Sequence, residues 1–240
     1  MLLLKLTHSY FTTDITSSKT LKTTFQTSNV WSCCCNLMSI IVRFAFNMFD
    51  VFEKHLRNYV EISDEDLELI RAGSVKRAIR KWQPILQDGE VWRINCFIVS
   101  GCFRLYRFGD DGTDHTLRFG VDSWWISDQE SYNNEKPSEY NIEALAASTV
   151  FIWTKEKWVE LMETIPALKK FNEILLAKSY EASQRRIFSL ISYSAEGKYN
   201  EFQKTYPSVF NRVPLHMVAS YLGISRETLS RIRKEYTKHH

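Results

Sequence analysis

The sequence predicts an α+β fold with three parts: a β-roll of the jelly-roll type, a long helix and a C-terminal helix-turn-helix. From about residue 75 to residue 154, short segments rich in β-branched and aromatic residues alternate with turn signals, which is typical of a small barrel or jelly roll. From residue 166 to about residue 194, the apolar residues follow a helical period. Between Leu215 and Lys234, two short helical patterns flank a glycine turn.

Length and composition indicate a globular chain with a basic C-terminal end. The 240 residues are 44% hydrophobic and 14% aromatic, which is enough to build a core, and the formal net charge is only +3. From Arg212 onward, six Lys or Arg residues stand against two acids, Glu227 and Glu235. A basic end of this kind suits a polyanion, although a solvated tail explains the charge equally well. The six are Arg212, Arg226, Arg231, Arg233, Lys234 and Lys238.

Residues 1–47 differ from the rest of the chain. They are rich in Thr and Ser and show no sustained helical or strand period, so we expect a disordered extension or an artefact of an upstream start codon. A cleaner pattern opens at Met48, where Phe49, Phe52, Leu56 and Tyr59 recur at helical spacing. A second helix should follow Ser63, whose hydroxyl is a good N-cap, with Leu67 and Ile70 inside it.

The five cysteines show no spaced disulfide framework and no Cys-x-x-Cys pair. Cys33 to Cys35 are adjacent and point in different directions, so we expect no metal and no cofactor. An iron–sulfur site that adds Cys96 and Cys102 as ligands is the alternative. No run reaches the roughly 18 apolar residues of a membrane helix, and no cleavage-site pattern is present, so we expect a reducing, cytoplasmic location.

The strand region contains turn signals that divide it. Gly109 to Gly112 is the strongest of them, because Asp-Gly tolerates a positive φ. Ser100-Gly101 is a second break, and Gln87 to Glu90 is a third. The predicted strands are residues 91–99, 102–108, 115–119, 141–147 and 149–154.

Helices follow the strands. A short one is predicted from Thr154 to Glu163, and Pro166 then stands in the first turn of a long one that runs to about Ser194. A helix with two apolar stripes has to bury one of them outside its own domain, so we predict a homodimer, with packing inside one chain as the alternative. The predicted contact residues, near a heptad spacing, are Leu168, Phe171, Leu175 and Ala182.

The segment from Val213 to Tyr236 has the pattern of a helix-turn-helix. Ala219 is small and lets the second helix cross closely over the first, Gly223 supplies a left-handed turn, and Ser225 caps the second helix. Leu229 and Ile232 should point back to Val218 and Leu222, which leaves the other face of the second helix outward. An αα-hairpin with a solvated basic face is the alternative.

The outward face has the residue types that bind DNA. Arg226, Glu227, Ser230 and Arg231 lie near the start of the second helix, where base edges are contacted. Arginine bonds guanine O6 and N7, and glutamate accepts from cytosine N4, whereas Thr228 and Arg233 are better placed for phosphates. The predicted DNA-binding set is Ser225, Arg226, Glu227, Thr228, Ser230, Arg231, Arg233 and Lys234.

The run Gly-Ile-Ser-Arg-Glu-Thr-Leu-Ser-Arg-Ile at 223–232 closely resembles the recognition element of the Crp/Fnr transcription regulators. The resemblance extends over residues 48–236. It implies a cyclic-nucleotide-binding-like sensor domain at 48–164, a dimerisation helix at 165–195 and a DNA-binding domain at 196–240. It also implies a homodimer on a two-fold-symmetric operator, with RNA polymerase as a further candidate partner. Arg226 and Arg231 would contact guanines, and Glu227 a cytosine.

Two departures from the family pattern stand out. Members that bind cyclic nucleotides hold the phosphate with an arginine. The corresponding stretch here, residues 120–148, contains no arginine, and Lys136 is its only basic residue. Glu139 would repel a phosphate, so we expect no response to cAMP. Six residues follow Lys234, too few for a β-hairpin wing, so we expect affinity to depend on the second helix and on Arg212, Lys234 and Lys238.

Four aromatic residues in the same stretch have no assigned role. Either they belong to the core of the β-roll or they line a pocket for an unknown ligand. The four are Trp124, Trp125, Tyr132 and Tyr140.

Two rival functions are weaker. An enzyme on the β-roll would need clustered ligands, but the strand region holds the single histidine His115, and no nucleophile elbow, phosphate loop or His-Glu-x-x-His motif occurs. We therefore predict a non-enzyme. A small-ligand-sensing or protein-interaction module with a vestigial helix-turn-helix is the other rival, and the intact set of Arg226, Glu227 and Arg231 argues against it.

Overall fold

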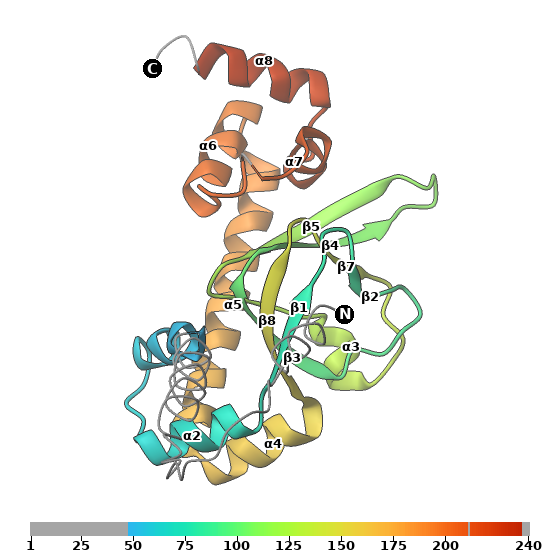
Figure 1. The fold of residues 1–240 in the computed structure, drawn as a ribbon. Helices are drawn as coiled ribbons and strands as arrows, with labels where there is room; N and C mark the ends of the chain where they lie inside the picture. The colour runs from blue at the N-terminus through green and yellow to red at the C-terminus, as the bar shows by residue number, and fades with distance from the viewer. Residues whose placement is uncertain (1–47, 211, 237–240) are drawn as a thin grey trace, which may run out of the picture. The chain divides into compact units, whose positions relative to one another are not determined.

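The computed structural model describes residues 48–210 and 212–236 and has the predicted α+β architecture (Figure 1). Within these residues, eight strands form two four-stranded antiparallel sheets, in the orders β1-β8-β3-β6 and β2-β7-β4-β5. The strands are β1 (Val75–Ile79), β2 (Pro84–Leu86), β3 (Ile94–Ser100), β4 (Cys102–Phe108), β5 (Asp114–Val121), β6 (Trp124–Ile126), β7 (Asn141–Ala144) and β8 (Ser148–Thr154). The helices are residues 48–57, α2 (Asp64–Ala72), α3 (Gln129–Asn134), α4 (Lys155–Thr164), α5 (Pro166–Ser192), α6 (Ala195–Thr205), α7 (Leu215–Leu222) and α8 (Arg226–Tyr236).

The inner core lies between the two sheets. Cys96 and Ile98 of β3 belong to it, together with Ile152 of β8. Phe97 of β3 and Trp153 of β8 instead join a second cluster on the opposite face of the same sheet. Successive side chains of a strand point to opposite faces, so strands with apolar residues at consecutive positions have to be covered on both sides.

Helices provide the cover on the outer face of the first sheet. The segment 48–57 buries Phe49, Phe52 and Leu56 there, each at most 1% exposed, which confirms the predicted helical face. Trp153 lies at the centre of this cluster: its ring centroid is 5.0 Å from that of Phe52. Its indole N–H donates to the carbonyl oxygen of Ile70 at 2.8 Å, so α2 is tied to β8.

Most predicted elements are present, with shifted ends. Ser63 caps α2 as predicted, because its hydroxyl accepts from the N–H of Asp66 at 3.1 Å. The strand predicted from residue 91 begins only at Ile94, since the N–H of Trp92 donates to the hydroxyl of Ser131 at 2.9 Å instead of to a neighbouring strand. Five elements are not singled out by the sequence, and two of them have only three residues, too few to show a period: β1, β2, β6, α3 and α6.

α5 corrects part of the predicted dimer contact. The helix begins at Pro166 as predicted. Leu168 and Phe171, however, are 0% exposed and pack in the core of their own chain, so the prediction that they face a second chain is wrong. The reason is local: the first turns of α5 lie against α4 and the outer face of the sheet. Leu175 is half-buried against the same core, whereas Ala182 is exposed.

The exposed apolar surface of α5 lies farther along the helix. Leu176, Tyr180, Ile187 and Leu190 follow a spacing of four, seven and three residues, which is close to the a and d positions of a heptad. These residues, with Phe188 and Ile191, are between 38% and 79% exposed. Figure 1 shows α2 and α4 near one end of α5 and α6, α7 and α8 at the other end.

Gly101, at the tight link between β3 and β4, should not tolerate a side chain. Its φ is +139°, and an added Cβ would overlap the side chain of Ser148 and lie 2.9 Å from the backbone Cα of that residue. We expect Gly101→Ala to lower the free energy of unfolding by about 2 kcal/mol, because backbone strain and overlap act together. Chemical denaturation of both proteins measures this. Gly89→Ala is a matched control with a φ of +88° and open space around the Cβ; an equal loss in both variants would show that overlap contributes nothing.

Several sequence-based expectations concern features that the structure describes only in part. Residues 1–47, including Cys33 to Cys35, lie outside the described residues. Cys96 and Cys102 are buried free thiols, and burial raises their pKa values to about 12 and about 11. In the described part of the chain, no group of three His, Cys, Asp or Glu residues could hold a metal ion. In that same part, every helix is too short or too polar to cross a membrane.

Candidate nucleic-acid interface

The helix-turn-helix is built by α7 and α8 with a glycine between them. Gly223 has φ 63° and ψ 40°, the left-handed conformation that the sequence predicts, and its N–H donates to the carbonyl oxygens of the last turn of α7. Ser225 then caps α8: its hydroxyl oxygen accepts from the N–H of Thr228 at 3.1 Å and donates to the hydroxyl of Thr228 at 3.0 Å. These local bonds fix the point where the second helix starts.

One face of α8 is buried. Leu229 is 0% exposed and Ile232 is 1% exposed, and both pack in one cluster with Val218, Ala219 and Leu222 of α7. Because side chains three or four residues apart share a helical face, burial of Leu229 and Ile232 sets the rotation of α8 about its axis. The opposite face is therefore turned outward.

The outward face presents most of the predicted DNA-binding residues. Arg226, Glu227, Arg231 and Lys234 are exposed, and Ser230 is half-buried beside them. Arg231 is 3.5 Å from Glu235 and 3.9 Å from Glu196, in ion pairs whose members are all exposed. Exposed pairs contribute about 0–1 kcal/mol, so an incoming phosphate or base could replace them at little cost.

Other residues predicted to support DNA binding already make contacts within the chain or lie outside the described residues. The hydroxyl of Thr228 is engaged with Ser225, and the guanidinium of Arg233 lies 4.7 Å from the ring centroid of Phe210. Arg212, predicted to support DNA affinity, forms an ion pair of 3.2 Å with Asp122. Lys238 lies outside the described residues.

The sequence gives no sign of a contact that joins α7 to β5. The hydroxyl of Ser220 donates to the carbonyl oxygen of Asp114 at 3.0 Å and accepts from the N–H of Thr116 at 2.9 Å. Arg186 of α5 donates to the carbonyl oxygens of Thr116 and Tyr221 at 3.3 and 3.0 Å. These bonds attach the inner side of the helix-turn-helix to the second sheet and leave the outward face of α8 uncovered.

Known structures share this arrangement. The chain is similar to FixK2 from Bradyrhizobium japonicum, with a TM-score of 0.61 and 14% identity over 69% of this chain and 85% of that one. For the c-di-GMP-responsive global regulator CLP of Xanthomonas campestris, the TM-score is 0.60 and the identity is 14% over 74% of this chain and 93% of that one. For a protein from Eubacterium rectale that is described as a transcriptional regulator of the Crp/Fnr family, the TM-score is 0.56 and the identity is 18% over 80% of this chain and 88% of that one. The chain has the Crp/Fnr fold.

These relationships are visible in the fold alone. No protein-family model matches the sequence, and no curated protein matches it. The descriptions of two of these structures, CLP and the protein from Eubacterium rectale, call them regulators. The match covers 85–93% of the length of these three structures.

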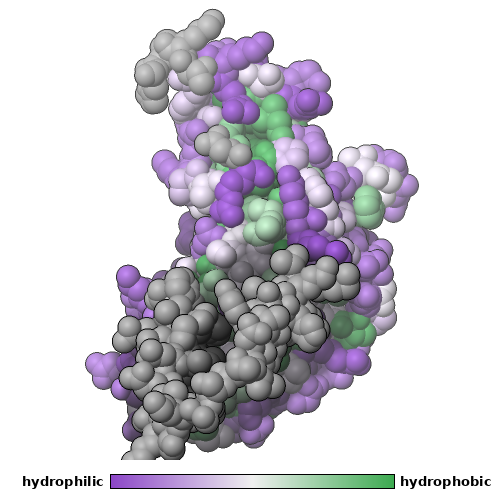
Figure 2. All heavy atoms as spheres, in the orientation of Figure 1, coloured by the Kyte–Doolittle hydropathy of each residue, from purple (hydrophilic) through white to green (hydrophobic). Residues whose placement is uncertain are grey.

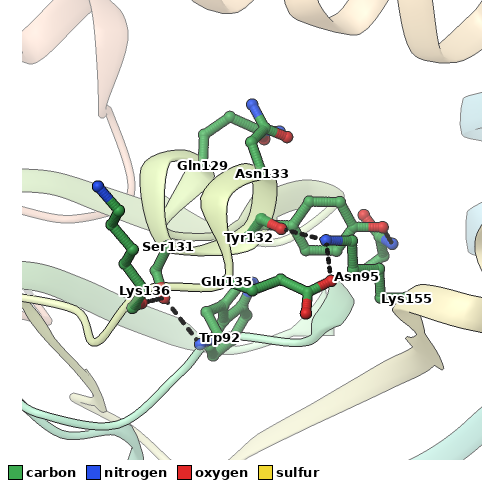
Figure 3. Close-up of polar contacts among 9 residues, drawn as sticks. All are labelled: Trp92, Asn95, Gln129, Ser131, Tyr132, Asn133, Glu135, Lys136 and Lys155. Carbon is green, nitrogen blue, oxygen red and sulfur yellow. Dashed lines mark hydrogen bonds and ion pairs between the residues drawn. The ribbon is translucent and has the colours of Figure 1, made fainter.

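The loop from Asp128 to Ser138, in the stretch where the resemblance to the Crp/Fnr family would place a phosphate-binding loop, is closed by its own hydrogen bonds. Asp128 is 5% exposed and caps α3, and the buried hydroxyl of Ser138 donates to its carboxylate at 2.6 Å. Figure 3 shows Ser131 of α3 bonded to Trp92 at the same place, with the Lys136 side chain extending away from both. Lys136 is exposed, so a phosphate in this loop would meet a buried carboxylate and no buried cation.

The four aromatic residues predicted as core or pocket fall in two places. Trp124 and Trp125 of β6 line a cavity of about 420 Å³ beside α5. Tyr132 of α3 is not among its lining residues; its hydroxyl accepts from the side-chain N–H of Asn95 at 2.7 Å (Figure 3). Tyr140, just before β7, does not line the cavity either. The sequence thus singled out two of the aromatic residues that line this cavity and missed its other aromatic residues and its charged ones.

Proposed function

We propose that the protein is a sequence-specific DNA-binding transcription regulator of the Crp/Fnr type in which α8 contacts the bases. The observation that supports this most is the division of α8 into a buried face, with Leu229 and Ile232, and an exposed face, with Arg226, Glu227 and Arg231. A helix held by one face and bearing bidentate donors near the start of the other suits the major groove. In this proposal, residues 48–164 form a sensor domain, 165–195 a dimerisation helix and 196–240 a DNA-binding domain.

The roles along α8 follow from position and residue type. Arg226 and Arg231 bond guanines, and Glu227 accepts from the amino group of a cytosine. Ser225, Thr228, Ser230, Arg233 and Lys234 contact phosphates or add to the base contacts. The exposed Lys234 contributes through charge, so its effect should depend strongly on salt.

A second copy of the chain would cover the apolar stripe of α5. Leu176, Tyr180, Ile187 and Leu190 are spaced as in a coiled coil, and large apolar side chains in a row rarely stay exposed in a monomer. Figure 2 shows green, hydrophobic surface in the upper half of the visible face, flanked by purple, hydrophilic surface. Two chains related by a two-fold axis would place two copies of α8 on a palindromic operator.

Selection of bound sequences from a random double-stranded DNA pool tests the proposal, with purified full-length protein and no added nucleotide. We expect a palindrome with G·C pairs in each half-site, since both arginines of α8 favour guanine. Addition of cAMP should leave the selected sequence and the affinity unchanged. Failure to recover any sequence would contradict ligand-independent DNA binding and favour an interaction module with a vestigial helix-turn-helix.

Arg226→Ala should weaken binding to the selected operator by about 1–3 kcal/mol and relax the preference at one base position in each half-site, because one bidentate guanine contact is lost. Fluorescence anisotropy with a labelled operator, repeated over several salt concentrations, measures both affinity and salt slope. Arg107→Ala is the matched control: Arg107 is an exposed arginine of β4 paired with Glu139 at 2.6 Å. Equal loss of affinity in the two variants would show that net charge, and not a base contact, is responsible.

A further inference from the structure

A cavity of about 420 Å³ lies where β5 and β6 meet α5, α6 and α7. Its volume falls in the range of about 300–1,000 Å³ that is usual for small-molecule sites. Much of its wall is aromatic, with side chains from both sheet and helices: Trp124, Trp125, Phe202, Tyr206 and Tyr221. Asp128 and Ser138 do not line this cavity, but Ser127 and Gln129, the residues on either side of Asp128, do, so the cavity borders the closed loop.

Arg118 of β5 lines the cavity without a counter-charge. The hydrogen bond that it makes is long, from Nη2 to the carbonyl oxygen of Trp125 at 3.4 Å, and its Nε is buried without a partner. Within the described part of the chain, no carboxylate forms an ion pair with Arg118. Burial lowers the pKa of the guanidinium, yet arginine keeps its charge in proteins. Leaving such a charge uncompensated is costly, which favours an anion beside it.

Neighbouring groups do not supply the missing negative charge. Tyr206 lies close to Arg118, but burial raises the pKa of its hydroxyl, which therefore stays neutral. Glu201 also lines the cavity, 3.9 Å from Lys204. Against this one carboxylate, the lining contains five cations: Arg118, Lys178, Arg185, Arg186 and Lys198.

Further lining groups have hydrogen-bond donors to offer. The indole N–H groups of Trp125 and Trp158 are buried without a partner, and Trp158 is only 1% exposed. An indole nitrogen donates and cannot accept, so these groups match a ligand rich in acceptor oxygens. The cavity thus combines a half-buried cation whose Nε is enclosed, hydrogen-bond donors without partners and aromatic surface.

We propose that this cavity binds a small aromatic carboxylate, with the carboxylate on the guanidinium of Arg118 and the ring against the side chains of Trp124 and Trp125. Bonds from a guanidinium to a carboxylate are charge-assisted and bidentate, and a ring in the ligand can stack on the indoles. Two lining residues, Leu176 and Leu190, also belong to the apolar stripe of α5, so binding has to be measured on the full-length protein in its native oligomeric state.

Isothermal titration calorimetry with 2-naphthoate tests the proposal. We expect one site per chain, and we expect the neutral isostere 2-naphthamide to bind at least tenfold more weakly, because it cannot pair with Arg118. Arg118→Gln should lower the affinity for naphthoate at least tenfold, and Arg118→Lys should retain part of it. Arg107→Gln, which removes an exposed arginine outside the cavity, should bind as the wild type does.

Equal binding of naphthoate and naphthamide by the wild-type protein would overturn the proposal, and so would undiminished naphthoate binding by Arg118→Gln. Binding of inorganic phosphate alone, with none of naphthoate, would overturn the aromatic class of the ligand. If Arg118→Gln fails to fold, the comparison of 2-naphthoate with 2-naphthamide on the wild-type protein still tests whether the ligand has to carry a negative charge. The titration contains no DNA, so a failure to bind naphthoate would not bear on the proposed DNA binding, which the operator selection tests separately. Only an effect of naphthoate on operator affinity would rest on the proposed function.

Discussion

Trp153→Ala is expected to lower the free energy of unfolding by about 3–5 kcal/mol, the usual cost of removing a large buried aromatic side chain. Trp153 is 0% exposed, and its ring lies within 5.2 Å of those of Phe52 and Trp158, measured between centroids. The substitution also removes the bond from the indole N–H to Ile70 and leaves a buried carbonyl without its partner. The helices on the outer face of the first sheet should therefore lose their main attachment.

Urea denaturation followed by circular dichroism measures the change for Trp153→Ala. Trp82→Ala is the matched control, because Trp82 is 46% exposed and its replacement should change the free energy of unfolding by less than about 0.5 kcal/mol. A loss below about 1 kcal/mol for Trp153→Ala would mean that the outer cluster is far less well packed than described. A similar loss for both tryptophans would mean that burial is not the cause.

Leu229→Ala should cost about 2–5 kcal/mol of unfolding free energy and also weaken operator binding. Leu229 is 0% exposed and sits in a cluster that includes residues of α6, α7 and α8 together with Phe119 of β5. A cavity at this position loosens the support of α8 while leaving Arg226, Glu227 and Arg231 in the sequence. Loss of affinity would then follow from a displaced helix and not from a lost base contact.

Two measurements separate these causes. Urea denaturation gives the stability of Leu229→Ala, and anisotropy with the selected operator, at a temperature where the variant is folded, gives its affinity. Leu69→Ala is the control, since Leu69 of α2 is 49% exposed and should have little effect on either quantity. Weaker operator binding without any loss of stability would contradict the supporting role and assign Leu229 to the DNA contact itself.

How much of this could be predicted from the sequence depended on how local each feature is. The turn at Gly223 and the cap at Ser225 involve neighbours within a few residues, so residue type and spacing were sufficient for both. The same holds for β4, whose bounds match the prediction because turn residues stand at both ends. Short elements such as β2 and β6 were missed, since three residues show no period.

The apolar stripe of α5 shows the limit of periodicity. Spacing alone placed Leu168 and Phe171 on a face toward a second chain, but both are buried against α4 and the first sheet. A helical period establishes that a face is apolar and does not establish what covers it. Which turns of the helix pack inside the chain depends on where α4 and the sheet lie, and that is a tertiary property.

The sequence by itself determined the β-roll, the long helix and the division of α8 into a buried and an exposed face, because periodicity, turns and caps act over short distances. Only the tertiary structure decided the attachment of Ser220 to β5 and the surroundings of Arg118. Arg118 is one arginine among many in the sequence. Arg118 is half-buried there because residues of α5, α6 and α7, distant along the chain, gather around β5, and none of the described carboxylates, Glu201 of α6 included, forms an ion pair with it.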